Sequence, residues 1–105
     1  MIAPIAFDAD LHCHSRVSDG MLAPAQVVSR AHAAGVRLHA LTDHDELAGI
    51  PEAAAEARRL GMAFVAGVEI SVSWGGETIH VVGLRVDPDE PTLVEGLART
   101  RGGRD

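Results

Sequence analysis

Two stretches that each begin at a proline and end at a glycine divide the first part of the chain into alternating strands and helices. Pro24 opens a segment whose apolar residues fall on one helical face, and Gly35 ends it. Pro51 opens a second, alanine-rich segment that stops at Gly61. Segments suited to strands surround these helices, at residues 6–12, where apolar and polar residues alternate, and at residues 37–42 and 62–68. This alternation indicates an α/β protein with a parallel sheet.

The remainder of the chain predicts a hairpin and one more helix. Residues 70–74 and 77–84 flank a Gly75-Gly76 turn, and a last helix is expected to begin near Pro91. At 105 residues, with 47% hydrophobic residues, the chain is expected to form a single domain with a packed core. Three parallel strands cannot close a barrel, so much of the sheet edge would need further chain or a partner to cover it.

Charge and composition exclude several classes of function. The net charge of −6 argues against a broad nucleic-acid surface, so an anionic substrate would need a local attraction such as bound cations. All nine basic residues are arginine, which excludes a Schiff-base lysine, a P-loop lysine and a carbamylated metal-bridging lysine from this stretch. The sequence has neither an apolar run of membrane-spanning length nor the start of a signal peptide. A cytoplasmic protein without membrane partners is therefore expected.

Side chains that bind metal ions follow the predicted strands. His12 and His14 alternate along the first strand, so both imidazoles project to one face and can chelate one ion. Because the active sites of α/β sheets lie at the carboxyl ends of their strands, ligands from several strands are expected to meet there. The candidate ligands are His12, His14, Asp19, His44, Glu69 and His80.

This ligand set favours a centre with several ions. Nitrogen and oxygen ligands suit zinc, manganese or iron better than copper(I) or an iron–sulfur cluster. Six side chains exceed what one catalytic ion takes from protein, so two or three ions are expected, with Glu69 as the natural bridge. Ions roughly 3.5–4 Å apart can clamp a phosphate, generate hydroxide near neutral pH and stabilise the leaving oxygen.

Each candidate also has a simpler interpretation. A lone His-X-His pair is a weak signal, and the added motifs at other strand ends strengthen it. Asp43 and Asp45 flank His44 and could be ligands, or could orient a ligating histidine from outside the coordination sphere. Taken alone, Glu69 would be a surface residue at a strand end, and His80 a half-exposed strand residue.

Five other residues are not expected to bind metal ions, and one of them, Arg16, has two possible roles. His32 and His39 are expected to be packing or surface histidines, and Cys13 a small core residue facing away from its two histidine neighbours. Arg16 either contacts a substrate phosphate or is an exposed loop arginine. Trp74 is expected to pack within the protein rather than to stack on a base.

The ordered motifs resemble the PHP (polymerase and histidinol phosphatase) family. The resemblance rests on Asp10–Gly20, Thr42–Asp45, Gly67–Glu69 and His80–Leu84, and covers nearly the whole chain. Within the family the sequence is most similar to small bacterial 3′,5′-nucleoside bisphosphate phosphatases, which are related to a 5′→3′ exoribonuclease. The Trp74-containing hairpin, His80 and Asp87-Pro88 indicate that branch.

The resemblance implies a fold, a cofactor set and an activity. The fold is the N-terminal part of a distorted (β/α)7 barrel that holds up to three ions, commonly manganese, zinc or iron. The activity is hydrolysis of phosphomonoesters of nucleotides, such as 3′-phosphoadenosine 5′-phosphate, or of short oligoribonucleotides, by metal-activated water. The implied ligands are His12, His14 and Glu69 for the first ion, Asp19 and His44 for the second, and Glu69 with His80 for the third, with Asp43 supporting them.

The sequence departs from the family pattern at its C-terminal end. The later metal motifs of the family, a further histidine and a terminal Asp-X-His, have no counterpart, so residues 1–105 are expected to be an N-terminal fragment of one PHP domain. Alone, this fragment is expected to bind metal weakly and to be largely inactive. Three alternatives remain open: a histidinol-phosphate-type phosphatase, a non-catalytic metal-binding PHP module, and an amidohydrolase-type C–N hydrolase, which usually needs the bridging lysine.

Overall fold

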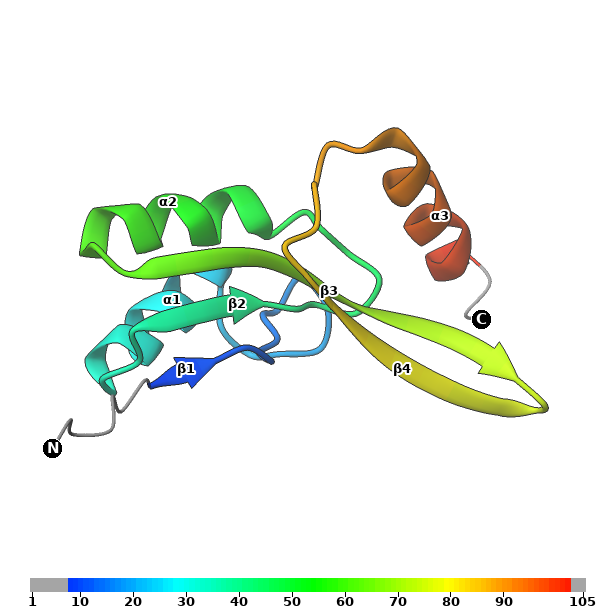
Figure 1. Ribbon diagram of the computed structural model, residues 1–105, viewed down its shortest axis with the longest axis horizontal. Coiled ribbons are helices and arrows are strands. Elements are labelled where there is room, and N and C mark those ends of the chain that lie inside the picture. The colour runs from blue at the N-terminus through cyan, green and yellow to red at the C-terminus, as the bar shows by residue number, and fades with distance from the viewer. Residues whose placement is uncertain (1–7, 103–105) are drawn as a thin grey trace, which may run out of the picture.

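A computed structural model describes residues 8–102 of the chain (Figure 1). Its elements follow the predicted alternation and form one four-stranded sheet of order β1-β2-β3-β4. The strands β1, β2 and β3 are parallel, and β4 is antiparallel to β3. The predicted α/β architecture is therefore confirmed. The elements are β1 (Ala9–Asp10), α1 (Pro24–Ala33), β2 (Leu38–Leu41), α2 (Ile50–Leu60), β3 (Ala63–Trp74), β4 (Glu77–Leu84) and α3 (Pro91–Gly102).

The two proline-to-glycine segments form the predicted helices. Gly35 and Gly61 have φ angles of 93° and 71°, which a residue with a side chain rarely adopts. After each glycine, the next amide donates back to the helix, from Val36 to the Ala31 carbonyl (3.0 Å) and from Met62 to the Ala57 carbonyl (2.9 Å). These bonds satisfy carbonyl groups that the helix ends would otherwise leave unpaired.

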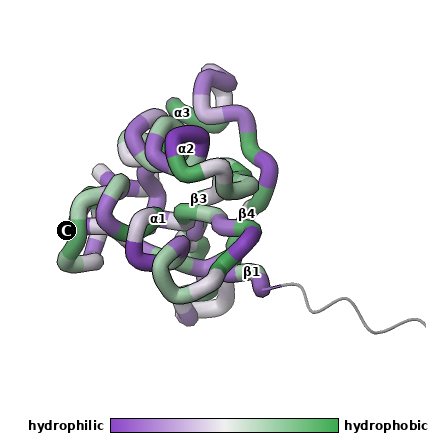
Figure 2. Tube along the Cα trace, turned by 90° about the vertical axis from the view of Figure 1, so that its left-hand side faces the viewer, coloured by the Kyte–Doolittle hydropathy of each residue, from purple (hydrophilic) through white to green (hydrophobic). Residues whose placement is uncertain are grey.

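The core lies between the sheet and the two helices. Helices α1 and α2 contact each other and the central strands β2 and β3. Hydrophilic and hydrophobic segments alternate along the helical parts of the trace (Figure 2), as expected of helices with one buried face. The buried cluster comprises Val27, Val28, Leu41, Leu47, Ile50, Ala53, Ala57, Met62, Val68 and Leu97. Within residues 8–102, no helix combines the length and the apolar character needed to cross a membrane.

The first strand is shorter than predicted. Of the expected strand 6–12, residues 6 and 7 lie outside the described part of the chain, and only Ala9 and Asp10 pair with β2. Beyond Asp10, the His12 amide donates to the carboxylate oxygen Oδ1 of Asp10 (3.2 Å). Side-chain bonding of this kind offers the backbone an alternative to the sheet ladder, so the chain leaves β2 earlier than the apolar pattern indicates.

The third strand is longer than predicted, and this corrects the position of Glu69. One continuous strand of 12 residues replaces the expected strand 62–68 and the separate hairpin arm 70–74. It pairs with β2 over Ala63–Ala66 and with β4 over Gly67–Trp74. Because β4 takes over as a partner, the chain stays extended. Glu69 therefore lies within the strand rather than at its end.

The tip of the hairpin also differs from expectation. Trp74 is 75% exposed beside the Gly75-Gly76 turn. The prediction that this residue packs within the protein is wrong for the described structure. The strand pair β3–β4 extends away from the two-helix layer (Figure 1), so its tip has no core to enter.

Candidate metal centre

Six predicted ligands converge at one end of the sheet, from four segments of the chain. His12, His14 and Asp19 come from the loop between β1 and α1, and His44 from the loop after β2. Glu69 lies on β3 and His80 on β4. An isolated parallel bridge between His44 and Glu69 continues the β2–β3 pairing to this point. The site thus lies where the parallel strands β1 and β2 end.

Glu69 lies at the centre of the cluster and is buried, with 4% of the residue exposed. Its oxygen Oε1 contacts the Nε2 atoms of His12 and His14, the latter at 3.2 Å. Its oxygen Oε2 lies 3.1 Å from Nδ1 of His44 and 3.5 Å from Nδ1 of His80. Each carboxylate oxygen therefore faces two imidazoles, as a group that bridges two cations would.

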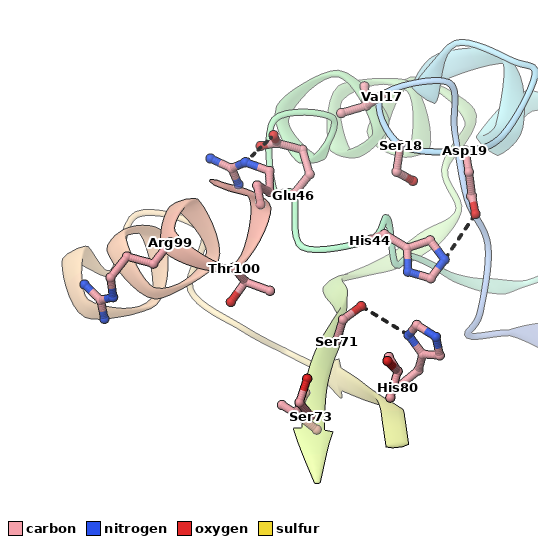
Figure 3. A pocket seen from close by; sticks show the side chains of 13 residues that line it. Val17, Ser18, Asp19, His44, Glu46, Ser71, Ser73, His80, Arg99 and Thr100 are labelled. Atoms are coloured by element: carbon pink, nitrogen blue, oxygen red, sulfur yellow. Dashed lines mark hydrogen bonds and ion pairs between the residues drawn. The ribbon is translucent and has the colours of Figure 1, made fainter. Parts of the chain in front are cut away.

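The carboxylate of Asp19 contacts the imidazoles of both His14 and His44. Its Oδ1 lies 2.7 Å from Nδ1 of His14. Its Oδ2 lies 3.1 Å from Nε2 of His44 (Figure 3). The ring centroids of these histidines are 4.4 Å apart. Both ring nitrogens of His14 and of His44 thus face a carboxylate, one from Asp19 and one from Glu69.

The cluster contains three overlapping groups that could each hold an ion. Within each group the ligand atoms all lie within 4.8 Å of one another. His14, His44 and Glu69 belong to two groups each, which favours a centre of several ions over a single one. The groups are His12, His14 and Glu69; His14, Asp19 and His44; and His44, Glu69 and His80.

The imidazoles also set the charge of Glu69. Burial alone would raise the pKa of this carboxyl. Hydrogen bonds from His12 and His14, together with the charges of His44 and His14, outweigh that effect and hold the pKa below its ordinary value. The buried carboxylate therefore stays ionised near neutral pH, the form in which it binds cations.

Asp43 supports the loop rather than joining the ligands. Its carboxylate accepts hydrogen bonds from the Ser15 amide (2.6 Å), the Ser15 hydroxyl (2.7 Å) and the Ser18 hydroxyl (2.6 Å). Asp43 is 1% exposed and Ser15 is fully buried. These bonds hold the segment between His14 and Asp19 in place. Asp45 has a comparable position, since its Oδ1 accepts the Ser71 amide of β3 (2.9 Å).

Replacing Asp43 with asparagine is expected to lower the free energy of unfolding by about 3 kcal/mol. Asparagine has the same shape but loses the charge and one acceptor oxygen. The buried donors of Ser15 and the partly buried hydroxyl of Ser18 are then left without a full set of partners. Urea denaturation followed by circular dichroism measures the change. Asp89→Asn, at an exposed position, is the matched control and should change stability by less than about 0.5 kcal/mol. Equal stability of the two variants would contradict a supporting role for Asp43.

Gly20 has a positional role that the sequence motif did not explain. A Cβ atom at this position would lie 2.4 Å from the carbonyl oxygen of His14 and 2.9 Å from the backbone of Ser15. Its amide donates to the Ser15 carbonyl (2.8 Å). Only glycine lets the loop fold back this closely on the segment that carries His14. The signal was the glycine at the end of the Ser18-Asp19-Gly20 turn.

A cavity of about 900 Å³ opens beside the cluster (Figure 3). Asp19, His44 and His80 form part of its wall. Helix α3 adds Arg99 and Arg101, which lie in no recognisable motif and so could not be singled out from the sequence. The Arg101 guanidinium donates to the Asp45 carbonyl (2.6 Å) and pairs with Glu46 (3.4 Å). Arg16 is exposed on its loop and is not part of the cavity wall.

Cys13 and His39, which lie outside this cluster and are at least partly buried, also have shifted pKa values. Burial, and then the hydrogen bond to Asp10, raises the pKa of the Cys13 thiol to about 12. Burial lowers the pKa of His39, and the charge of Asp10 offsets only part of that effect. His39 is fully buried, as a packing histidine was expected to be, whereas His32 is exposed.

The lowered pKa of His39 predicts a dependence of stability on pH. The unfolded chain, with an ordinary histidine pKa near ~6.5, binds this proton at a higher pH than the folded chain does. The stability that neutral His39 contributes is therefore complete above about pH 6.5 and is lost as the pH falls. When the pH is lowered from about 7 to about 5, the free energy of unfolding should fall less in His39→Phe than in the unsubstituted chain. The two slopes should differ by up to about 1.4 kcal/mol per pH unit.

Urea denaturation in the presence of a chelator tests this expectation. Phenylalanine keeps a ring beside Phe64, whose centroid lies 6.0 Å from that of His39. His32→Phe makes the same change at an exposed position and should leave the pH dependence unaltered. Parallel pH profiles for His39→Phe and the unsubstituted chain would contradict the expectation.

Comparisons with known proteins agree on one family. A profile of the PHP domain matches residues 10–98. The chain is 57% identical over 95 residues to a 3′,5′-nucleoside bisphosphate phosphatase of Chromobacterium violaceum, covering 90% of this chain and 33% of that protein. It is 47% identical over 96 residues to a 5′-3′ exoribonuclease of Haemophilus influenzae, covering 91% and 35%. The chain thus spans about a third of the length of these relatives.

Solved structures show the same fold. A Chromobacterium violaceum structure described as an amidohydrolase, with bound sulfate and no metal, superposes with a TM-score of 0.90 at 56% identity, covering 92% of this chain and 34% of that one. A Bifidobacterium adolescentis structure, provisionally described as a metal-dependent phosphoesterase, has a TM-score of 0.87 at 31% identity, covering 97% and 36%. These matches confirm the predicted fold class, the N-terminal part of a PHP-type α/β barrel.

Proposed function

Because this chain belongs to the PHP domain family, we propose that it carries the metal centre of a phosphoesterase that hydrolyses phosphomonoesters of nucleotides. One observation carries the proposal: a buried, ionised carboxylate, that of Glu69, stands between four imidazoles beside an open cavity. Relatives of this chain are described as a nucleoside bisphosphate phosphatase and an exoribonuclease.

The donor set fits divalent cations. Four imidazoles and two carboxylates bring nitrogen and oxygen atoms together without lysine or arginine between them, and such donors suit manganese, zinc or iron. We propose two or three ions, with manganese as the first candidate and zinc or iron as alternatives. His12, His14 and Glu69 would hold one, Asp19 and His44 with His14 a second, and Glu69 and His80 with His44 a third. Divalent cations at such a site supply the positive charge that neutralises phosphate oxygens and the acidity that activates water.

The chain's own residues position this chemistry. Glu69 and Asp19 fix the orientation of His14 and His44 by facing both nitrogens of each ring. Ser71 lies 3.2 Å from Nδ1 of His80 and orients that ring at the cavity wall. A cavity of about 900 Å³ falls within the size range of small-molecule sites and has room for a nucleotide. Arg16, exposed on the loop after His14, is proposed to reach the substrate phosphate from the rim.

The proposed substrate class rests on the chemistry of the site and on the similarity of this chain to other proteins of the family. The sulfate in the Chromobacterium violaceum structure is a tetrahedral oxyanion, as a phosphate monoester is. We propose 3′,5′-nucleoside bisphosphates such as 3′-phosphoadenosine 5′-phosphate, or short oligoribonucleotides, as substrates. A negatively charged protein needs its cations to attract such a substrate, because the chain as a whole has a net charge of −6.

Hydrolysis of a C–N bond is the second candidate, because the 56% identical structure is described as an amidohydrolase. Two features of the chain favour phosphate instead. Glu69 is placed where it could bridge two ions, and the sequence contains no lysine that could be carbamylated to do so.

A chimera tests the proposed function. In it, this chain replaces the matching third of the Chromobacterium violaceum phosphatase, to which it is 57% identical. With Mn²⁺, the chimera is expected to release phosphate from 3′-phosphoadenosine 5′-phosphate at a rate within tenfold of that relative and to leave N-acyl amino acids intact. A folded chimera that binds Mn²⁺ but hydrolyses only the amides would overturn the proposal.

A further inference from the structure

A second group of metal-binding side chains lies away from the Glu69 centre. It consists of Asp10, Cys13 and His39, whose carboxylate oxygen, sulfur and ring nitrogen all lie within 4.8 Å of one another. None of the three belongs to the groups around Glu69. Asp10 and Cys13 line a different cavity, of about 540 Å³, which is bordered by residues of α1 such as Val27.

The backbone fixes this arrangement independently of the first centre. Asp10 and His39 are register partners in the β1–β2 ladder, so their side chains leave adjacent strands side by side. Cys13 is held by Thr42 through three hydrogen bonds. The Cys13 amide donates to the Thr42 hydroxyl (3.0 Å), and the Cys13 carbonyl accepts from the Thr42 amide (2.8 Å) and from the Thr42 hydroxyl (3.2 Å). Its thiol then donates to Oδ2 of Asp10 (3.4 Å).

His39 is the observation that points to a ligand. It is fully buried, and neither of its ring nitrogens has a hydrogen-bond partner in the described part of the chain. A buried polar group without a partner destabilises the folded state, so such groups are rare and call for an explanation. The ring does have an aromatic neighbour, Phe64, which lies tilted to it with the ring centroids 6.0 Å apart. A cation held between His39, Cys13 and Asp10 would give one of these nitrogens its partner.

We propose that Asp10, Cys13 and His39 form a second metal site, separate from the Glu69 centre and selective for zinc. Sulfur, nitrogen and oxygen donors together are the ligand set of zinc, whereas manganese prefers oxygen. With the cysteine bound as thiolate and the aspartate as carboxylate, the two negative charges balance one Zn²⁺ ion. That neutrality suits a partly buried site. Three protein ligands leave a fourth position for water from the adjoining cavity.

The second site would fasten the first strand to the sheet. Within the described residues, strand β1 pairs with β2 through two residue pairs. The proposed ion joins a residue of β1, a residue of β2 and Cys13, which lies between His12 and His14 in the sequence. The ion would therefore hold in place the segment that carries two ligands of the Glu69 centre. This inference does not depend on the substrate of that centre.

Titration with Co²⁺, a spectroscopic substitute for zinc, tests the site. Cys13 is the only cysteine in the sequence, so a near-ultraviolet thiolate-to-cobalt absorption band reports this site alone. In reduced protein, we expect the band to reach full intensity when each chain has bound one Co²⁺ ion through Cys13. The band should disappear when Zn²⁺ is added, because zinc displaces cobalt from the same site. Cys13→Ser and His39→Phe should each lower its intensity at least tenfold. His44→Ala, which alters only the Glu69 centre, should retain it.

Three results would overturn the proposal. The first is the absence of the band in the unsubstituted chain at saturating Co²⁺, which requires no variant to fold. The second is loss of the band in His44→Ala with unchanged circular dichroism, because the sulfur would then bind an ion of the Glu69 centre. The third is retention of the band in a folded His39→Phe variant. Asp10→Asn provides a second, shape-conserving variant in which the affinity for Co²⁺ at this site should fall at least tenfold.

Discussion

Replacing Glu69 with glutamine is expected to weaken Mn²⁺ binding by this chain at least about a hundredfold and to abolish phosphate release by the chimera. Loss of a residue that merely orients a ligand already costs about 10–100-fold in affinity, and Glu69 is itself the proposed bridge. Glutamine keeps the shape but offers one neutral oxygen in place of two charged ones. Two of the three ligand groups would lose their only carboxylate.

Isothermal titration with Mn²⁺ measures the affinity, and circular dichroism confirms that the variant folds. Glu56→Gln makes the same change on the surface of α2, where Glu56 pairs only with Arg59 in the described structure, and should bind Mn²⁺ as the unsubstituted chain does. A Glu69→Gln variant that binds the same number of ions with the same affinity would contradict the proposed centre.

Replacing His14 with alanine is expected to remove at least one bound ion and to reduce phosphate release by the chimera at least about a thousandfold, since metal-centre electrostatics supply several kcal/mol of transition-state stabilisation. His14 faces Glu69 through Nε2 and Asp19 through Nδ1, so its loss opens two ligand groups at once. By comparison, His80 belongs to a single group and is about half exposed. His80→Ala should therefore have the smaller effect.

Elemental analysis of the dialysed protein gives the number of ions per chain, and a phosphate-release assay gives the rate. His32→Ala, an exposed histidine on α1, controls for the loss of an imidazole as such. If His14→Ala and His32→Ala retained equal metal content, His14 would not be a ligand.

The parts of this molecule that could be predicted from its sequence are those fixed by local chemistry. Pro24 and Gly35 bound a helix because one has no amide hydrogen to lose and the other accepts a positive φ, whatever lies elsewhere in the fold. The convergence of His12, His14 and Glu69 was expected from the rule that neighbouring parallel strands end at one edge of a sheet, although His12 and His14 lie in the loop after β1 and Glu69 lies within β3.

What could not be predicted depends on where each strand pairing begins and ends and on how the elements are arranged in space. The unbroken course of β3 through Glu69 depends on β4 taking over from β2, which no local pattern records. The exposure of Trp74 reflects how far the hairpin extends beyond the helices. Likewise, the grouping of Asp10, Cys13 and His39 required the register between β1 and β2, because a shift of one residue would turn these side chains to opposite faces.

The change of pairing partner along β3 has a consequence for the order of events in folding. The β3–β4 hairpin closes a short loop, so Glu69 and His80, 11 positions apart, can meet early. His12 and Glu69 are separated by 57 positions, and their contact must await closure of the entire β-α-β-α-β segment. Ions at the Glu69 centre would therefore engage a nearly finished fold. They would stabilise the protein chiefly by slowing its unfolding, while its rate of folding would change little.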